Sequence, residues 1–292
     1  KAVFVSKLPE HEIGQAGINS LRQYGVDTSF IVRGGKRVGI YFLEKGASQR
    51  ASKVIYDRLN SSISLASKEE FDWYKIFENA KWFHFTGITP ALSDDVAEIC
   101  LEACKSAKKK KVQISCDLNY RSKLWSKEKA GDVMSKLCNY VDVCIANEED
   151  AVNVFGIKAK HTNIIAGKVD TTGYKEVAQE LKKRFNFSKI AITLRGSISA
   201  SDNRWSAMLY DGTNFFFSKE YVLHIVDRVG GGDSFGAGLV YSLIKEYSGQ
   251  EAIEFAVAAS CLKHSIEGDY NQISLDEIKK LVGGDASGRV QR

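Results

Sequence analysis

The sequence predicts an α/β protein with a mainly parallel central sheet and a small β-rich lid. Three observations support this class. From about Trp82 onward, apolar strand patterns alternate with helical patterns, which is typical of βαβ crossovers. Before that point, residues 26–58 are rich in strand-forming residues and are interrupted by glycines. The chain has 292 residues and 44% hydrophobic content, which is enough for a sizeable core.

The N-terminal part of the chain is predicted to contribute to both the core and the lid. "KAVFVSKL" is expected to be a strand, and "EIGQAGINSLRQYG" has the apolar spacing of a helix that ends at Gly25. The runs "TSFIVRGG", "VGIYFLEKG" and "SKVIYDR" are interpreted as a small antiparallel sheet. We therefore assign residues 1–25 and 59–292 to the α/β core and residues 26–58 to the lid.

The remaining elements follow one another in a regular order. Ser93 is expected to cap a helix that runs to about Lys109. The strands predicted after it are "KVQISCDLN", "VDVCIAN" and "KIAITLRG", and the helices are "KEKAGDVMSKLCNY", "EEDAVNVFG" and "YKEVAQELKKRF". "SAMLYDG" and "NFFFS" are predicted to form a hairpin with Asp211-Gly212 at its turn. Three helices follow: one from Ser234 that is apolar all round, one over "EAIEFAVAASCLKHSI" and one from about Ser274.

Composition argues against a nucleic-acid-binding or membrane protein. The net charge of +5 is a mild excess spread along the chain, and the basic run Lys108–Lys111 is interpreted as a solvated helix end. The sequence contains neither an apolar run of about 18 residues nor a signal-peptide pattern. Six cysteines occur without a CxxC pair, which fits reduced thiols better than a zinc site. We therefore expect a cytoplasmic protein.

Polar residues follow three of the predicted strands. Ligands of open α/β sheets bind beyond the carboxyl ends of the strands, so the candidate site is placed there. The residues concerned are Asp117, Asn119 and Arg121; Asn147, Glu148 and Asp150; and Arg195 and Gly196. An arginine after a strand suits a bidentate contact with a carboxylate, although Arg121 could also form a surface salt bridge.

The stretch "VDRVGGGDSFGAGLVYSLI", Val226–Ile244, contains three consecutive glycines. One interpretation is a flexible loop. The other is an anion site, because the first amides of the following helix have no intrahelical partner and the helix dipole favours negative charge. Gly230, Gly231 and Gly232 carry no β-carbon, so a phosphate could approach these amides closely.

Asp233 follows the glycines and has two interpretations. It could be a helix N-cap. It could also accept the proton of an attacking hydroxyl beside a phosphate cradle, as phosphoryl transfer requires. No GxxxxGK[ST] occurs, and no GxGxxG follows a strand, so the two common nucleotide motifs are missing.

The segment "DRVGGGDSFGAG", Asp227–Gly238, resembles the D-x-x-G-A-G-D signature of the ribokinase-like (PfkB) carbohydrate kinases. The resemblance extends over essentially the whole chain. The fragments "IYFLEKGASQRASKVIYDR", "WFHFTGITPALS", "DLNYRSKLWS", "IANEEDA", "SASDNRWSAMLYDG" and "KHSIEGDYN" look like 2-keto-3-deoxygluconate kinases of the Gram-positive type. This implies a ribokinase-like three-layer sandwich that uses ATP and Mg²⁺ to phosphorylate 2-keto-3-deoxygluconate to its 6-phosphate.

The resemblance also implies roles for individual residues. Asp233 would be the catalytic base, and Gly230, Gly231 and Gly232 would form the anion hole. The sugar acid would contact Tyr41, Tyr56, Arg58, Arg121 and Asp269. The nucleotide would contact Asn147, Arg195, Gly196, Gly230 and Gly232. Taken alone, the two tyrosines also fit a core or sheet face.

The magnesium motif of the family, N-x-x-E, is altered in this chain. It is Asn147-Glu148-Glu149-Asp150 here, so Asp150 and Glu149 are predicted to hold the metal through water. His84 and His264 are assigned packing or hydrogen-bonding roles, because the reaction already has a base. The first strand of the family and its G-G-x-x-x-N segment are not found in this sequence, and Lys1 aligns with the start of the second strand.

Three alternatives to this function remain open. The chain could be a kinase of another sugar or sugar acid, such as fructose, ribose or 5-keto-gluconate. It could be a non-catalytic sugar or nucleotide sensor, or, less favoured because the dinucleotide fingerprint is absent, an NAD-dependent oxidoreductase. The expected partners are a small sugar acid, ATP and a second copy of the chain bound through the lid, with no nucleic acid and no membrane.

Overall fold

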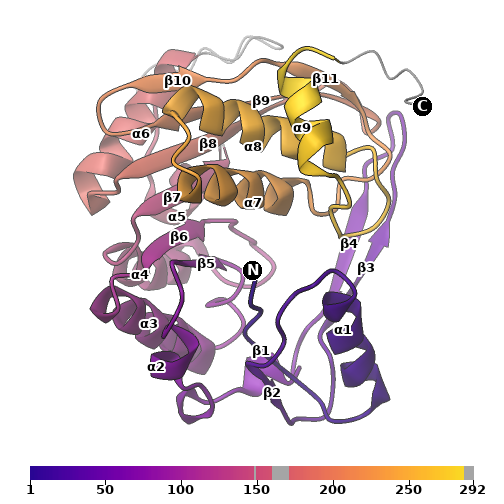
Figure 1. Ribbon diagram of the computed structural model, residues 1–292, viewed down its shortest axis with the longest axis vertical. Helices are drawn as coiled ribbons and strands as arrows, with labels where there is room; N and C mark the ends of the chain where they lie inside the picture. The colour runs from indigo at the N-terminus through magenta and orange to yellow at the C-terminus, as the bar shows by residue number, and fades with distance from the viewer. Residues whose placement is uncertain (148, 160–170, 286–292) are drawn as a thin grey trace. The chain divides into compact units, whose positions relative to one another are not determined.

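The computed structural model describes residues 1–147, 149–159 and 171–285 (Figure 1). The chain divides into two compact units, and each contains both strands and helices. The first unit holds Lys1–Glu44, Lys53–Asp142 and Asn153–Phe155. The second holds Lys45–Ser52, Val143–Val152 and the chain from Gly156 onward.

The first unit begins with β1 (Ser6–Leu8), α1 (Glu12–Arg22) and β2 (Ile31–Arg33). β1 and β2 pair in parallel, with Ser6 opposite Ile31 and Leu8 opposite Arg33. A helix between two strands carries the chain back so that the second strand runs in the same direction as the first. The expectation that residues 31–33 join an antiparallel sheet is therefore wrong.

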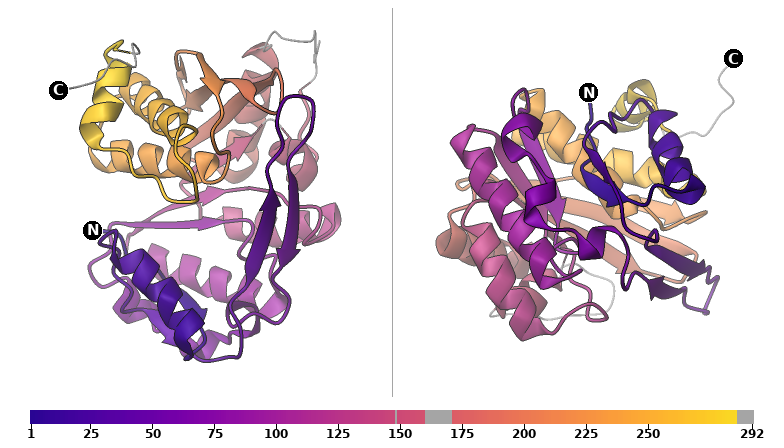
Figure 2. Two further views of the ribbon diagram at one scale, coloured as in Figure 1. Left: turned by 90° about the vertical axis from the view of Figure 1, so that its right-hand side faces the viewer. Right: turned by 90° about the horizontal axis from the view of Figure 1, so that it is seen from below.

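β3 (Ile40–Glu44) and β4 (Lys53–Asp57) form a two-stranded antiparallel ribbon, which the left view of Figure 2 shows clearly. The antiparallel prediction is correct for these two runs. One face of the ribbon exposes apolar side chains: Ile40, Phe42 and Ile55 are 42%, 58% and 53% exposed. The boundaries of a separate lid at residues 26–58 stay a prediction.

The rest of the first unit alternates strands with helices. Its elements are η1 (Ile63–Leu65), η2 (Lys68–Glu70), α2 (Trp73–Ile76), β5 (Trp82–Thr86), α3 (Asp94–Lys109), β6 (Gln113–Asp117) and α4 (Lys127–Cys138). β5 and β6 are parallel, with Thr86 opposite Asp117 at their carboxyl ends. Ser93 accepts a hydrogen bond of 3.2 Å from the backbone nitrogen of Val96, so the predicted helix cap is confirmed.

The sheet of the second unit is mixed. Its strands are β7 (Val143–Asn147), β8 (Lys189–Ser197), β9 (Asp202–Tyr210), β10 (Phe215–Phe217) and β11 (Tyr221–His224). Two helices follow β7: α5 (Asp150–Phe155), whose last three residues are grouped with the first unit, and α6 (Thr171–Phe185). β7 and β8 are parallel, with Asn147 opposite Thr193. β9 and β10 form the predicted antiparallel hairpin around Asp211-Gly212. β11 also pairs with β9, which the sequence did not predict.

Three helices complete the second unit: α7 (Gly231–Ile244), α8 (Gly249–Lys263) and α9 (Leu275–Val282). α7 and α8 lie side by side (Figure 1). A β-carbon on Gly238 would lie 3.0 Å from the Cα of Ala256, so this glycine allows the two helices to approach closely. Phe235 and Leu239 are fully buried, as the apolar pattern of the helix predicts.

Within the described residues, no helix is both long and apolar enough to cross a membrane. The six cysteines are present as thiols, five of them buried. Burial raises the pKa of Cys104 and of Cys261 to about 12, so both thiols stay protonated at neutral pH.

Candidate active site

The three glycines at the start of α7 differ in what surrounds them. Gly230 is the N-cap, with a left-handed φ of 74°, and a β-carbon there would meet the carbonyl oxygen of Asp269. A β-carbon on Gly231 would lie 2.6 Å from Cε1 of His264. At Gly232 nothing lies within 4 Å of that position. Packing therefore requires the first two glycines, whereas the third borders open space.

The end of α8 supports this segment from behind. The hydroxyl of Ser260 donates a hydrogen bond of 2.7 Å to the carbonyl of Gly231. His264 is 3% exposed, and its Nδ1 donates to the carbonyl of Ser260 at 2.7 Å, so its predicted hydrogen-bonding role is confirmed.

The charges of three cations act on the imidazole of His264. Burial lowers the pKa of His264, and the charges of Arg195, Lys263 and Arg228 lower it further, against the hydrogen bond to Ser260. The ring that packs on Gly231 is therefore neutral near pH 7. The same positive charges, felt at the ring that packs on Gly231, would also favour an anion near this segment.

Asp233 lies in the first turn of α7 and is exposed. The N-cap of this helix is Gly230, so the N-cap interpretation of Asp233 is wrong. A carboxylate in the first turn is favoured by the helix dipole. The carboxylate follows directly after Gly232, the glycine that borders open space.

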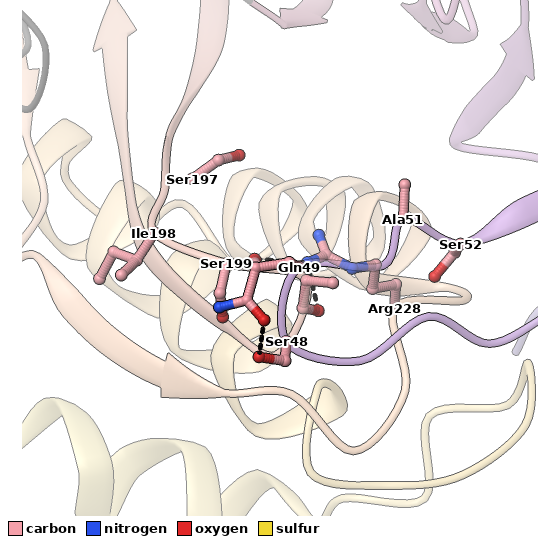
Figure 3. Close-up of a pocket in the computed structure, with 9 residues that line it drawn as sticks. Ser48, Gln49, Ala51, Ser52, Ser197, Ile198, Ser199 and Arg228 are labelled. Atoms are coloured by element: carbon pink, nitrogen blue, oxygen red, sulfur yellow. Dashed lines mark hydrogen bonds between the residues drawn. The ribbon is translucent and has the colours of Figure 1, made fainter.

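The second unit contains a cavity of about 560 Å³ at the turn between β8 and β9 (Figure 3). The backbone nitrogen of Ser48 donates to Oγ of Ser201 at 2.9 Å, and that of Ala200 donates to the carbonyl of Ser48 at 2.7 Å. These bonds hold residues 48–52 against the turn. The cavity is lined by Ser48, Gln49, Ala51, Ser52, Ser197, Ile198, Ser199, Ala200 and Arg228.

Arg228 provides the cationic side chain of this cavity. Its Nη2 donates to the carbonyl of Ala200 at 2.7 Å and to that of Ser199 at 3.3 Å. Burial lowers the pKa of Arg228, and the charge of Arg195 lowers it further. Arg195 itself lies over the ring of Trp205, 5.3 Å from the ring centroid. Two mutually repelling guanidinium groups in one region suit a polyanionic ligand.

Gly196 lies next to these cations on β8. It pairs with Arg204 across the sheet, and a β-carbon there would lie 3.1 Å from the Cβ of Arg204. Close packing is thus one reason for glycine at this position. Its predicted contact with the nucleotide stays a prediction.

Asp227 is a part of this region that the sequence analysis missed, although it is the first aspartate of the motif quoted above. It accepts hydrogen bonds of 3.1 Å from the backbone nitrogens of Val229 and Gly268, and it pairs with Lys45 at 3.2 Å. Lys45 also pairs with Glu267 at 3.1 Å. Burial raises the pKa of Asp227, but these hydrogen bonds and Lys45 lower it more, to below its ordinary value.

Asn147 and Asp150 close the turn between β7 and α5. Oδ1 of Asn147 accepts from the backbone nitrogens of Glu149 at 2.8 Å and Asp150 at 3.0 Å. In return, Oδ2 of Asp150 accepts from the backbone nitrogen of Asn147 at 3.0 Å. Asp150 is 2% exposed, whereas Glu149 is exposed. Glu148 lies outside the described residues.

In the part of the chain that the structure describes, no group of three His, Cys, Asp or Glu side chains could hold a metal ion. This donor set fits Mg²⁺ only as an ion held mainly by water and phosphate oxygens, which is how magnesium often binds in phosphoryl-transfer sites. The roles of Asp150 and Glu149 stay predictions.

The first unit brings three of the predicted sugar-acid residues together. Tyr41 and Tyr56 lie opposite each other on β3 and β4. The guanidinium of Arg58 lies 4.6 Å from the ring centroid of Tyr56 and 6.0 Å from that of Tyr41. Lys123, which the sequence analysis missed, has its Nζ 5.9 Å from the Tyr56 centroid. Arg121 is half-buried and donates to the carbonyl of Tyr120 at 3.0 Å.

A glycine-rich helix N-terminus with a carboxylate in its first turn and cationic side chains nearby is the arrangement expected of a phosphotransferase. The chain belongs to the pfkB family of carbohydrate kinases, whose family model matches residues 1–275. It is a carbohydrate kinase with a ribokinase-like α/β fold, in which antiparallel strands are added to a mostly parallel central sheet.

Several relatives are similar over nearly the whole chain. The crystal structure of 2-dehydro-3-deoxygluconokinase from Thermotoga maritima is 50% identical, with a TM-score of 0.92, over 97% of this chain and 84% of that chain. The 2-dehydro-3-deoxygalactonokinase of Haloferax volcanii is 31% identical over 98% of this chain and 83% of its own length. The 5-dehydro-2-deoxygluconokinase of Clostridium tetani is 25% identical over 97% of this chain and 78% of its own length.

Proposed function

We propose that this kinase transfers the γ-phosphoryl group of ATP to the primary hydroxyl of 2-keto-3-deoxygluconate and gives the 6-phosphate. The observation that carries the proposal is the open space at Gly232, next to the exposed carboxylate of Asp233 and one residue after Gly231, which packs on His264. The similarity to 2-dehydro-3-deoxygluconokinase at 50% identity supports this substrate.

The residues of the second unit account for the chemistry. The hydroxyl oxygen of the sugar acid forms a bond to the γ-phosphorus, the bond from that phosphorus to the oxygen of ADP breaks, and Asp233 accepts the hydroxyl proton. The backbone amides at Gly230–Gly232 stabilise the charge on the moving phosphoryl group. When bound, Mg²⁺ would neutralise part of the phosphate charge, and Asp150 and Glu149 would hold it through water.

The cavity at the β8–β9 turn is the proposed nucleotide pocket. Arg228 lines it, and Arg195 and Gly196 precede it on β8. Guanidinium groups form strong charge-assisted hydrogen bonds with phosphate, whereas the serine hydroxyls of the wall suit the ribose. Asn147 would contact the nucleotide from the end of β7.

The sugar acid would be recognised through its carboxylate. Arg58 and Arg121 are the proposed partners of this group, because a neutral sugar would not need two arginines. Tyr41 and Tyr56 would contact the sugar chain, and Asp269 would accept hydrogen bonds from its hydroxyls.

The exposed apolar face of the β3–β4 ribbon supports a homo-oligomer formed through the lid. Phe42 and Ile55 lie directly opposite each other and are 58% and 53% exposed. A two-stranded ribbon with such a face is stabilised when a second copy covers it.

A substrate panel tests the proposal. With ATP and Mg²⁺, ADP release should be most efficient with 2-keto-3-deoxygluconate, and the galactonate epimer is the second candidate because of the Haloferax relative. 5-Dehydro-2-deoxygluconate, fructose and ribose complete the panel. A higher kcat/KM with a neutral sugar would contradict the proposal, and ligand binding without turnover on any member would favour a sensor.

A further inference from the structure

Lys263, the last residue of α8, is completely buried. Its Nζ donates a hydrogen bond of 2.9 Å to the carbonyl oxygen of Ile266. A lysine near the C-terminus of a helix can bond to such a carbonyl from the surface, so this bond does not explain why the ammonium is buried. Burying a charge costs free energy unless other groups compensate for it.

The charges around Lys263 compensate for its burial only in part. Burial lowers the pKa of Lys263, while the carboxylates of Asp227 and Asp269 raise it and Lys45 lowers it again. Asp227 already shares its charge with Lys45 at 3.2 Å. The pKa remains below its ordinary value, so a further negative charge nearby would stabilise the ammonium.

The side chain of Lys263 runs directly behind the glycine segment. Its Cε lies 3.4 Å from the point where Gly230 would carry a β-carbon, and the carbonyl of Asp269 faces the same point. His264 packs in the same way behind Gly231. Two consecutive residues at the end of α8 therefore support two consecutive glycines, one through a neutral ring and the other through a cationic side chain.

We propose that Lys263 is a positioning residue for phosphoryl transfer, whose buried ammonium acts through Gly230 and residues 266–269 to strengthen the anion hole. This inference rests on the proposed function of the glycine segment. A triphosphate at Gly232 would bring a further negative charge that stabilises the ammonium of Lys263. The amides of Gly230–Gly232 would then bind the moving phosphoryl group in a more positive field than backbone dipoles alone provide.

The test is the variant Lys263→Gln, which keeps an N–H donor for Ile266 but removes the charge. We expect kcat to fall by about 10- to 100-fold, as is typical when a group that stabilises transition-state charge is lost. The melting temperature and the KM for the sugar acid should stay near those of the wild type. Lys263→Arg should restore part of kcat, and Lys279→Met, on the exposed face of α9, is the matched control.

A binding experiment separates the effect of charge from an effect on structure. Calorimetry should show weaker binding of Mg-ADP to Lys263→Gln, by about 10-fold, with adenosine binding unchanged, because only the phosphates carry charge. If adenosine, ADP and the melting temperature all change together, Lys263 is structural and the proposal fails. It also fails if Lys263→Gln keeps kcat within about twofold.

Two further outcomes are informative. If Lys263→Gln does not fold, Lys263→Met is measured in the same way, and failure of both variants while Lys263→Arg folds would show a purely structural role. If the wild type phosphorylates no sugar acid, the proposed function fails. If the wild type is active and the charge-free variants are equally active, only this inference fails.

Discussion

The imidazole of His264 occupies the space beside Gly231, where a β-carbon would lie only 2.6 Å from Cε1 of the ring. Gly232, the next residue, has nothing within 4 Å of the same position. Glycine is thus required at adjacent positions of one motif for different physical reasons. Gly231 is required by the folded protein, whereas Gly232 leaves room that the folded protein does not use.

The variant Gly232→Ala separates a requirement of folding from a requirement of ligand binding. An alanine fits the first turn of a helix and improves helix propensity by up to about 1 kcal/mol, so the melting temperature should stay or rise. The added methyl group would occupy the space proposed for phosphate, so Mg-ADP affinity should fall by about 10-fold or more. Calorimetry and a melting curve on the same sample measure both effects.

Gly231→Ala is the control for this experiment, because its methyl group would collide with His264. It should lower the melting temperature. Unchanged ADP affinity in Gly232→Ala would contradict the anion hole and return the glycines to an ordinary flexible turn.

Arg58→Gln should weaken the use of the sugar acid selectively. The loss of a charge-assisted contact costs about 1.5–3 kcal/mol, so KM for the sugar acid should rise by about 10-fold or more. KM for ATP should change by less than about twofold, because the proposed partner of Arg58 is the carboxylate of the sugar acid and not the nucleotide. Steady-state kinetics with each substrate varied in turn measures this.

Arg204→Gln, which removes the exposed ion pair with Glu220, is the matched control. Equal losses for both substrates in Arg58→Gln would refute the assignment.

The lowered pKa of His264 predicts that the stability of the protein depends on pH. Its pKa in the folded protein lies below the ordinary value of 6.5. Below that pH the unfolded chain binds a proton that the folded protein does not, so the free energy of unfolding falls as the pH drops from 6.5 toward the folded pKa. The slope is at most about 1.4 kcal/mol per pH unit.

Urea unfolding between pH 7.5 and 5.5 tests this for the wild type and for His264→Asn, which keeps a short amide donor for Ser260. The variant should lose part of the slope. Equal slopes in the two proteins would mean that His264 titrates normally.

The exposed face of β3 and β4 predicts an oligomer. Phe42→Asp places a charge in the centre of this face, opposite Ile55, and should convert the wild-type oligomer into monomers in sedimentation experiments. Val222→Asp is the control, because Val222 is 71% exposed but lies on β11. A wild type that is already monomeric at micromolar concentration would contradict the prediction.

Local signals in the sequence predicted much of the fold. Ser93 caps the helix that it was expected to cap, and a helix begins at Ser274 as expected, because a capping hydrogen bond forms within one turn. The hairpin at Asp211-Gly212 is likewise fixed by local turn residues. The partner of β2 was assigned incorrectly, and β11 was missed, because strand pairing depends on distant residues that a local pattern does not specify.

The site was predictable in part for the same reason. The glycine motif predicts an anion site, but the groups that pack near this motif come from the end of α8 and from Lys45, which lie far away in the sequence. The N-cap interpretation of Asp233 failed because Gly230 adopts a left-handed conformation and begins the helix three residues earlier. The only sequence signal for the left-handed φ of Gly230 is the glycine itself.

The most direct test of the account is the turnover of Asp233→Asn. Asparagine keeps the shape of the side chain, and the N-cap of the helix is Gly230, not residue 233. The change removes the proton acceptor, and general-base catalysis is worth about 10²–10⁴-fold, so kcat should fall by at least 100-fold while melting temperature and ligand affinities stay unchanged. A variant that melts normally and turns over within about threefold of the wild type would contradict the role of Asp233 as the base.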